Sequence, residues 1–408
     1  MIEHPPALRR HFAALTSLRL VAAMAVVLLH FFALSGSHPP VGDAAAAEAA
    51  RPVRGAILAA MPWLSQGHLA VDFFFVLSGF VLAHAYAAAW EGGTFRYGRF
   101  LRRRVARIYP LHLATLLAFV AVVAAARLAG AQVDVNGYDF ASVPSHLLLV
   151  HAWGVEQWMT FNGPSWSISA EWLAYLLFPV AAWAVWKPRP PVAAAAAVGW
   201  FLGCDWLFSS PGHPMTSRAV DFGALRIIAE FPLGVALWRV LRWQADGGRP
   251  RWSGAAALWG GAAGSLVSAS LAWPPAVTVL GLAAVVYGTA AVEQAGGLRW
   301  LQNRWLVYGG EISYSVYMTH ALIQVFLEKA ARSGRLGDVA VATDTLMLVG
   351  VPVTLLASHL AYRLIEVPGR RWVIGQGGRR GDTADNHTAV LDGPATTAFH
   401  APAPTATA

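Results

Sequence analysis

Hydrophobic and polar positions alternate in long blocks along this chain. Ten blocks of predominantly apolar residues are separated by polar segments, many of them rich in arginine. A helix needs about 20 residues to cross the hydrocarbon core, and it satisfies its own backbone hydrogen bonds there. The pattern therefore predicts an all-α membrane protein, a bundle of about ten transmembrane helices. The predicted spans are 13–34, 66–88, 107–129, 165–186, 192–209, 221–241, 253–272, 275–293, 307–329 and 341–365.

The segment 143–161 is also apolar, but it does not fit this count. A full crossing there would place Lys187 and Arg189 on the outer side, against the positive-inside rule. We therefore expect a re-entrant or interfacial segment near 143–161. We expect the whole chain to divide into a cytoplasmic N-terminus, a transmembrane domain and a cytoplasmic tail, and we expect the tail to be disordered. These three parts are 1–12, 13–368 and 369–408.

Composition supports this class and excludes others. Of the 408 residues, 56% are hydrophobic and only 13% are charged, whereas soluble domains carry roughly 25% charged residues. The formal net charge is +8, but the basic residues gather in loops that share one side when ten spans are counted. We therefore expect both termini in the cytoplasm, the lipid bilayer as a partner and no nucleic acid. No metal-binding or nucleophile-elbow motif is present, so we expect neither a metal nor a bound cofactor.

Polar residues inside the apolar blocks are the candidates for function, and His30 is the first. It follows Arg19 by eleven residues, which is about three helical turns, so the two side chains share a helix face. Ionisable groups within a membrane are costly, and they mark functional sites by default. Two interpretations remain open for His30: a catalytic imidazole, or a structural hydrogen bond to a neighbouring helix.

The second and third spans carry further candidates. Asp72 either caps the second helix or orients a base or a substrate hydroxyl. Arg104 and Arg107 are three residues apart and share a helix face. This pair either anchors the helix at the cytoplasmic surface or clamps phosphates, whose geometry matches the guanidinium fork.

The sequence WSISAE opens the fourth span with Trp166, Ser167 and Glu171. Ser167 and Glu171 are four residues apart and lie on one face. Glu171 has no basic neighbour in the sequence, so it must find a cation, a hydroxyl or water. A functional role is slightly favoured over a structural hydrogen bond. Trp166 has the character of an interfacial aromatic residue.

The last two spans contain polar residues near their ends. Tyr314 and His320 lie in ISYSVYMTH, and a structural role for His320 is favoured over direct involvement. Glu366 stands just before Pro368. We expect Glu366 to end the helix and to pair with Arg363 or Arg370.

Taken together, these segments resemble the acyltransferase-3 family of bacterial membrane O-acyltransferases. The matching segments, in order, are LRLVAAMAVVLLH, VDFFFVLSGF, RRRVARIYP, WSISAE, ISYSVYMTH and YRLIEVP. The resemblance implies a multi-pass protein of the bacterial cytoplasmic (inner) membrane. It also implies transfer of an acyl group, usually acetyl, from cytoplasmic acyl-CoA to a hydroxyl of a cell-envelope or exported glycan. The implied acceptor partner is a glycan or a lipid-linked sugar. This chain departs from the family where Ala170 replaces a frequent second acid, and we expect no fused hydrolase-like domain after the last span.

The resemblance also implies roles for single residues. His30 would act as a general base on the acceptor hydroxyl, or as the nucleophile of an acyl-histidine relay. Glu171 and Asp72 would tune His30 or position the acceptor. The remaining assignments are acyl-CoA binding by Arg19, Arg104 and Arg107, and acceptor positioning by Ser167, Trp166, Tyr314 and His320.

Two other classes of function fit part of the pattern. A proton-coupled transporter or flippase also needs buried His, Asp and Glu residues, although no matching halves with interrupted helices are visible. A structural scaffold would not need so many costly intramembrane charges.

Overall fold

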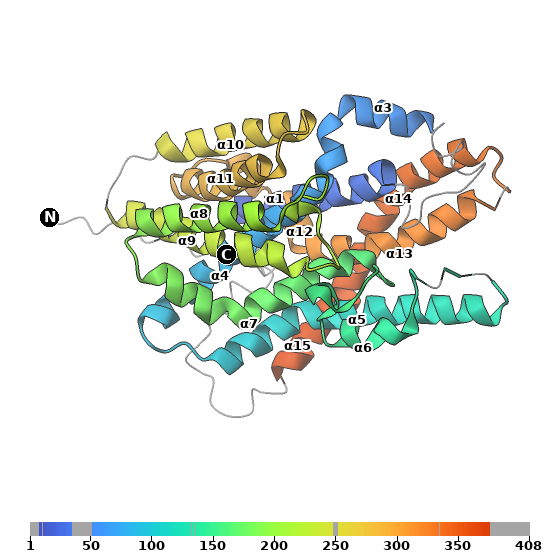
Figure 1. The fold of residues 1–408 in the computed structure, drawn as a ribbon, viewed down its shortest axis with the longest axis horizontal. Coiled ribbons are helices and arrows are strands. Elements are labelled where there is room, and N and C mark those ends of the chain that lie inside the picture. Colours follow the sequence, from blue (N-terminus) through green and yellow to red (C-terminus); the bar gives the residue numbers. More distant parts are fainter. Residues whose placement is uncertain are drawn as a thin grey trace, which may run out of the picture.

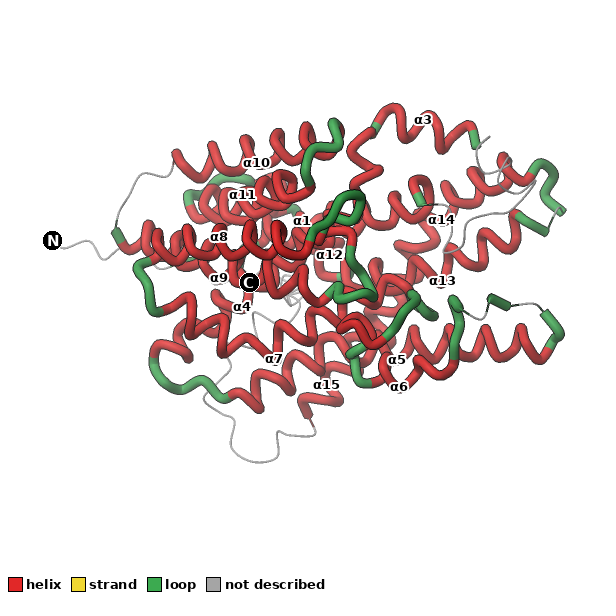
Figure 2. The backbone as a smooth tube through the Cα atoms, in the orientation of Figure 1, coloured by secondary structure: helices red, strands yellow, loops and turns green. Residues whose placement is uncertain are grey.

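The structure is a computed structural model that describes residues 8–9, 11–34, 51–131, 133–134, 136–247, 252–333 and 335–375. Within these ranges the chain is helical, and Figure 2 shows helices joined by loops without a strand. The predicted all-α class is therefore confirmed. Residues 376–408 of the predicted tail lie outside the described residues.

Most helices run along one common direction, the long axis of the molecule (Figure 1). In chain order they are α1 (Ala13–Leu28), α3 (Pro52–Ala60), α4 (Ala70–Glu91), α5 (Tyr97–Leu128), α6 (Val143–Leu147), α7 (Trp166–Trp186), α8 (Pro190–Phe208), α9 (Ala224–Asp246), α10 (Trp252–Ser270), α11 (Pro275–Gln294), α12 (Arg304–Glu311), α13 (Ser313–Ala331), α14 (Val339–Ala361) and α15 (Val367–Gly375).

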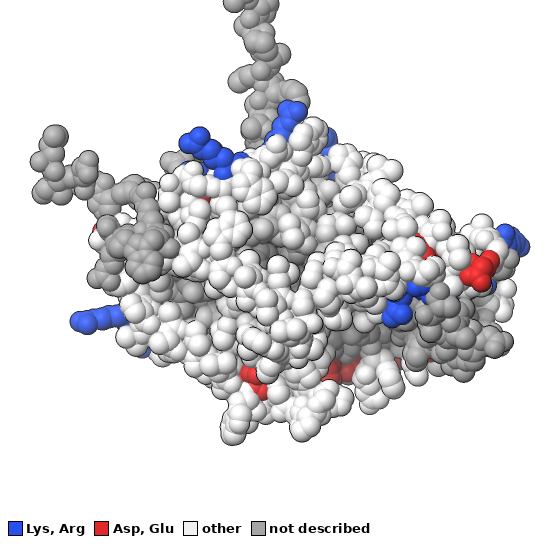
Figure 3. All heavy atoms as spheres, turned by 90° about the horizontal axis from the view of Figure 1, so that it is seen from above, with Lys and Arg blue, Asp and Glu red and all other residues white. Residues whose placement is uncertain are grey.

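Seven helical segments of the described chain are long and apolar enough to cross a membrane. They contain α1, α4, α5, α7, α8, α11 and α14. Three predicted spans fall outside this set, because α9 carries several charged residues, α10 is rich in Gly, Ala and Ser, and α13 is rich in polar residues. The count of ten spans stays a prediction. In Figure 3 the charged side chains lie mostly toward the edge of the view, and the middle of this face is uncharged, as a membrane-facing surface requires.

Two predicted boundaries were wrong. The span 307–329 is not one helix, because α12 and α13 meet at a break at Ile312. Gly309 and Gly310 stand just before the break, and glycine weakens a helix interior. Residues 369–375, which the sequence analysis places in the tail, belong to α15.

The bundle is held by close pairs of helices, including α4 on α9, α10 on α11 and α13 on α14. At the α4–α9 crossing, a Cβ atom added to Gly79 would lie 2.1 Å from the carbonyl oxygen of Phe231. One added to Gly234 would lie 1.9 Å from the carbonyl oxygen of Val76. Only glycine permits this approach, which is the usual packing device between membrane helices.

The segment 143–161 is irregular and packs on the start of α7. It contains the short helix α6 and a turn at His151–Val155. Ser169 of α7 holds this turn, because its hydroxyl donates to the carbonyl of Leu149 (2.8 Å) and accepts from the amide of Ala152 (3.1 Å). The segment is not among the spanning helices. Its re-entrant or interfacial placement stays a prediction.

Candidate active site

A cavity of about 220 Å³ lies between α1, α4, α5, α7 and α13. Six of the predicted site residues line it: Arg19, Arg104, Arg107, Ser167, Glu171 and Tyr314. They come from four helices that are distant in sequence. The predicted motifs therefore converge on one space. Arg370 and Glu311 line it as well, so four guanidinium groups and two carboxylates surround it.

Glu171 finds hydroxyl partners in the bundle. Its Oε1 atom accepts hydrogen bonds from Ser78 Oγ of α4 (3.1 Å) and from the hydroxyl of Tyr175, one turn further along α7 (2.5 Å). The expectation that this carboxylate must find a cation, a hydroxyl or water is met by these two hydroxyls. The carboxylate is held at the cavity wall, where it faces the same space as the arginines.

Arg107 forms an ion pair with Glu366, which is fully buried at the end of the last long helix. Ser315 Oγ donates to the other carboxylate oxygen of Glu366 (2.8 Å). The expected pairing of Glu366 with Arg363 or Arg370 was therefore wrong. The guanidinium also lies over the ring of Tyr314, 5.4 Å from its centroid, so Arg107 is fixed on two sides.

Arg104 and Arg19 complete the basic wall in different ways. The Arg104 guanidinium is buried among the rings of Tyr86, Phe100 and Tyr175, each 5.8–5.9 Å away. Such cation–π contacts stabilise a charge out of water. The guanidinium of Arg19 makes no hydrogen bond to any described residue, although it lines the cavity. Its five N–H donors are available to a ligand.

His30 lies in a π-helical turn, Leu29–Ala33, that continues α1. Its Nδ1 atom is 2.8 Å from the carbonyl oxygen of Val26. Because a carbonyl only accepts, Nδ1 carries a proton, and in the neutral form of the ring Nε2 then keeps its lone pair. Nε2 has no hydrogen-bond partner among the described residues. The π-helical turn therefore presents an imidazole whose Nε2 is unoccupied within the described chain, and such turns are frequent at functional sites.

A second imidazole stands against His30. The ring of His320 packs edge-on at a centroid distance of 4.8 Å, and its Nδ1 donates to the carbonyl of Tyr317 (2.6 Å). His320 is fully buried, and its Nε2 also lacks a partner within the described chain. Both rings are thus held in the same tautomer by backbone carbonyls.

His30 and His320 do not line the cavity, and Tyr317 lies between the cavity and this pair. Tyr317 lines the cavity, accepts a hydrogen bond from Ser167 Oγ (2.9 Å) and donates to the carbonyl of Pro164 (2.9 Å). Its ring centroid is 5.9 Å from that of His320. Tyr317 was not among the predicted site residues, although its spacing of three residues from His320 indicates that the two side chains share a helix face.

Asp72 is engaged elsewhere. Its carboxylate accepts from Nε (3.1 Å) and Nη2 (2.6 Å) of Arg226 on α9, and both side chains are buried. Asp72 neither caps its helix nor lines the cavity. The Arg226 guanidinium lies 4.6 Å from the centroid of a Trp166 ring, so this pair supports the residue next to Ser167. Arg226, an arginine inside a predicted span, was missed.

Comparison with known proteins gives a consistent result. An acyltransferase domain model matches residues 12–363. Acyltransferase MdmB from Streptomyces mycarofaciens is 30% identical over 334 residues, which cover 75% of this chain and 81% of that protein. Protein 2 in picA locus from Rhizobium radiobacter is 33% identical over 131 residues, or 31% of this chain and 69% of that protein. No solved structure matches.

Proposed function

Because the chain belongs to the acyltransferase-3 family and is an acyltransferase, we propose that it transfers an acyl group, most readily acetyl, from acyl-CoA to a hydroxyl of an envelope or exported glycan. The donor would enter from the cytoplasmic side of the bacterial inner membrane. The acceptor would reach the site from the outer side. The family favours this enzyme over the transporter alternative.

One observation carries the proposal: a single helix, α1, brings Arg19 to the cavity and His30 to a turn with a free Nε2. Coenzyme A carries several phosphate charges, and guanidinium groups match phosphate geometry. We assign donor binding to Arg19, Arg104 and Arg107, with the thioester directed toward the histidine pair.

The chemical step needs one proton transfer and one acyl transfer. Nε2 of His30 takes the proton from the acceptor hydroxyl as the oxygen attacks the thioester carbonyl. The C–S bond breaks, and the thiolate of coenzyme A leaves and takes up a proton from the imidazolium. In the acyl-histidine alternative, Nε2 attacks the thioester carbonyl, the C–S bond breaks and the thiolate of coenzyme A leaves. The hydroxyl oxygen then attacks the acyl-imidazole, the C–N bond breaks, and the hydroxyl proton passes to the thiolate.

The other predicted residues would position this reaction. Glu171 and Ser167 fix the hydroxyls of Tyr175 and Tyr317 at the cavity wall, and Tyr314 supports Arg107. His320 would orient His30 through ring contact. We assign Asp72 to the support of Trp166 through Arg226, in place of tuning His30 or positioning the acceptor.

The donor assignment is tested by measuring acyl transfer from two matched thioesters by the full-length protein in lipid nanodiscs. Acetyl-CoA and acetyl-pantetheine carry the same reactive group, but only the first carries the nucleotide phosphates. We expect saturable label transfer from acetyl-CoA and a much higher KM for acetyl-pantetheine. Equal KM values would contradict phosphate binding by the arginines, and no thioester turnover would contradict the donor class.

The acceptor class is tested in cells. Mass spectrometry of envelope and exported glycans, with and without the protein, should show O-acyl groups that depend on it. Unchanged glycans in cells with active protein would contradict a glycan acceptor.

A further inference from the structure

The π-helical turn that carries His30 ends with carbonyl groups that have no partner inside the helix. The last four C=O groups of any helix lack intrahelical donors. Here the amide of Leu34 satisfies the carbonyl of Leu29 (2.7 Å), and the next three carbonyls need donors from elsewhere.

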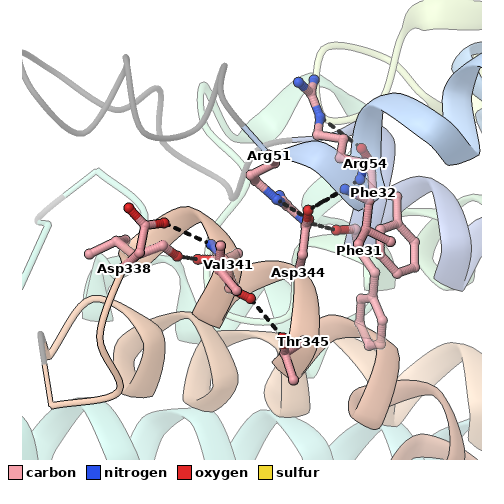
Figure 4. A network of polar contacts seen from close by, with 11 residues as sticks. Phe31, Phe32, Arg51, Arg54, Asp338, Val341, Asp344 and Thr345 are labelled. Carbon is pink, nitrogen blue, oxygen red and sulfur yellow. Dashed lines mark hydrogen bonds and ion pairs between the residues drawn. The ribbon is translucent and has the colours of Figure 1, made fainter.

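Three side chains supply those donors, one for each carbonyl, and they come from α13, from α3 and from the residue before α3. Gln324 Nε2 of α13 donates to the carbonyl of His30 itself (2.9 Å). Arg51 Nη2 donates to the carbonyl of Phe31 (3.0 Å), and Arg54 Nε donates to that of Phe32 (2.9 Å). Figure 4 shows both arginines reaching the end of this turn.

Asp344 of α14 holds the arginines in place. Its Oδ1 accepts from Arg51 Nε (2.7 Å), and its Oδ2 accepts from the backbone amides of Val53 (2.7 Å) and Arg54 (3.3 Å) at the start of α3 (Figure 4). The side chain of Arg51 is 3% exposed and that of Asp344 is 1% exposed. A buried ion pair gives little net stability, but it fixes geometry, because breaking it leaves a charge without compensation.

From this arrangement we propose that Arg51, Arg54 and Asp344, with Gln324, form a clamp that fixes the position of the His30 imidazole. They are positioning residues, since none lines the cavity. The clamp acts on the backbone of the turn and leaves Nε2 open. Its effect on catalysis rests on the proposed function of His30.

The test compares two Asp→Asn changes on one helix in the full-length protein. Asp344→Asn removes the charge that holds Arg51. Asp338→Asn is the matched control: Asp338 caps the start of α14 through the amide of Val341 (3.0 Å), and asparagine caps equally well. Arg54→Ala is a milder variant that leaves the Arg51–Asp344 pair intact, and Arg54→Lys keeps one donor.

Two readouts are measured on each variant. Hydrogen exchange at the C2 position of His30, followed by mass spectrometry, reports on the ring environment without any need for activity. Steady-state transfer separates kcat from the KM for acyl-CoA. We expect several-fold altered exchange at His30 and a kcat lower by about tenfold to 100-fold, because small displacements of a reacting group have effects of this size. The KM should stay within about twofold, because the donor arginines are untouched, and Arg54→Lys should recover part of kcat.

The outcomes separate the clamp from the proposed function. Unchanged His30 exchange in folded Asp344→Asn and Arg54→Ala overturns the clamp, whatever happens to kcat. Altered exchange in both, with Asp338→Asn unaffected, supports it. If exchange changes while kcat stays normal, the clamp stands and the assignment of His30 as the base fails.

Discussion

Arg19 and His30 lie toward opposite ends of one helical segment, and their surroundings differ in charge and in contact with the cavity. Arg19 lines a cavity with three further arginines and two glutamates, whereas His30 lies beyond Tyr317 and beside a second imidazole. A charged, open region suits a phosphate-bearing donor, and a proton acceptor needs a neutral nitrogen with a free lone pair. Because the two surroundings differ, mutations should separate donor binding from proton transfer, although both residues lie on the same helical segment.

The largest effect should come from the histidine end. We expect His30→Ala to lower kcat by about 10²–10⁴-fold, the usual contribution of a general base, with the KM for acyl-CoA little changed. Steady-state transfer by purified protein is the measurement. His213→Ala, in an exposed loop, is the control and should retain activity. Wild-type turnover by folded His30→Ala would remove His30 from the chemistry.

A destabilising effect is expected beside the site. Asp72→Ala removes the carboxylate that binds the buried guanidinium of Arg226, and breaking such a pair costs about 3–5 kcal/mol. The double variant Asp72→Leu with Arg226→Met should recover most of that loss in thermal unfolding. If the double variant folds but has no transfer activity, a catalytic role for Asp72 would be restored.

The arginine end should respond mainly through donor affinity. Arg19→Gln removes a charged fork that makes no hydrogen bond to the described chain, so we expect the KM for acetyl-CoA to rise about tenfold, or about 1.4 kcal/mol. The KM for acetyl-pantetheine should not change. Arg242→Gln, which breaks a partly exposed pair with Glu91, serves as the control. If Arg19→Gln lowered only kcat and left the KM for acetyl-CoA unchanged, it would contradict the assignment of donor binding to Arg19 and of chemistry to His30.

A separate effect, which depends on pH, is expected at the buried histidines of the segment 143–161. His146 is buried and stacks on His151 at 3.9 Å, and burial, with the nearby His112, lowers the pKa of His146 to about 3. The unfolded chain then binds more protons than the folded one, so stability is lost as the pH falls from about 6.5 toward 3. At pH 5 the loss is roughly 2 kcal/mol for this group. Thermal unfolding of His146→Gln should show a weaker pH dependence than the wild type, and an unchanged dependence would argue against this account.

The sequence predicted what depends on local pattern. Long apolar blocks predicted the helices, and residues within single motifs, such as Ser167 with Glu171 and Arg104 with Arg107, do share a wall of the cavity. Helical spacing alone determines such faces. The residues came together because each motif lies near the same level of the bundle.

The long-range pairs could not be predicted in this way. Partners in the pairs Asp72–Arg226, Arg107–Glu366 and Arg51–Asp344 are 154, 259 and 293 residues apart. Which helices pack together decides these pairings, and spacing within one helix carries no information on that. The π-helical turn at His30 was missed for a related reason, since its carbonyl partners come from α3, α13 and the residue before α3.

The most direct test measures donor binding and single-turnover transfer in the same sample of His30→Ala protein, with labelled acetyl-CoA and an acceptor glycan. If α1 separates binding from chemistry, the variant binds the donor with wild-type affinity and transfers almost no label to the acceptor. Normal transfer of the bound label, or loss of donor binding in parallel with transfer, would contradict the account.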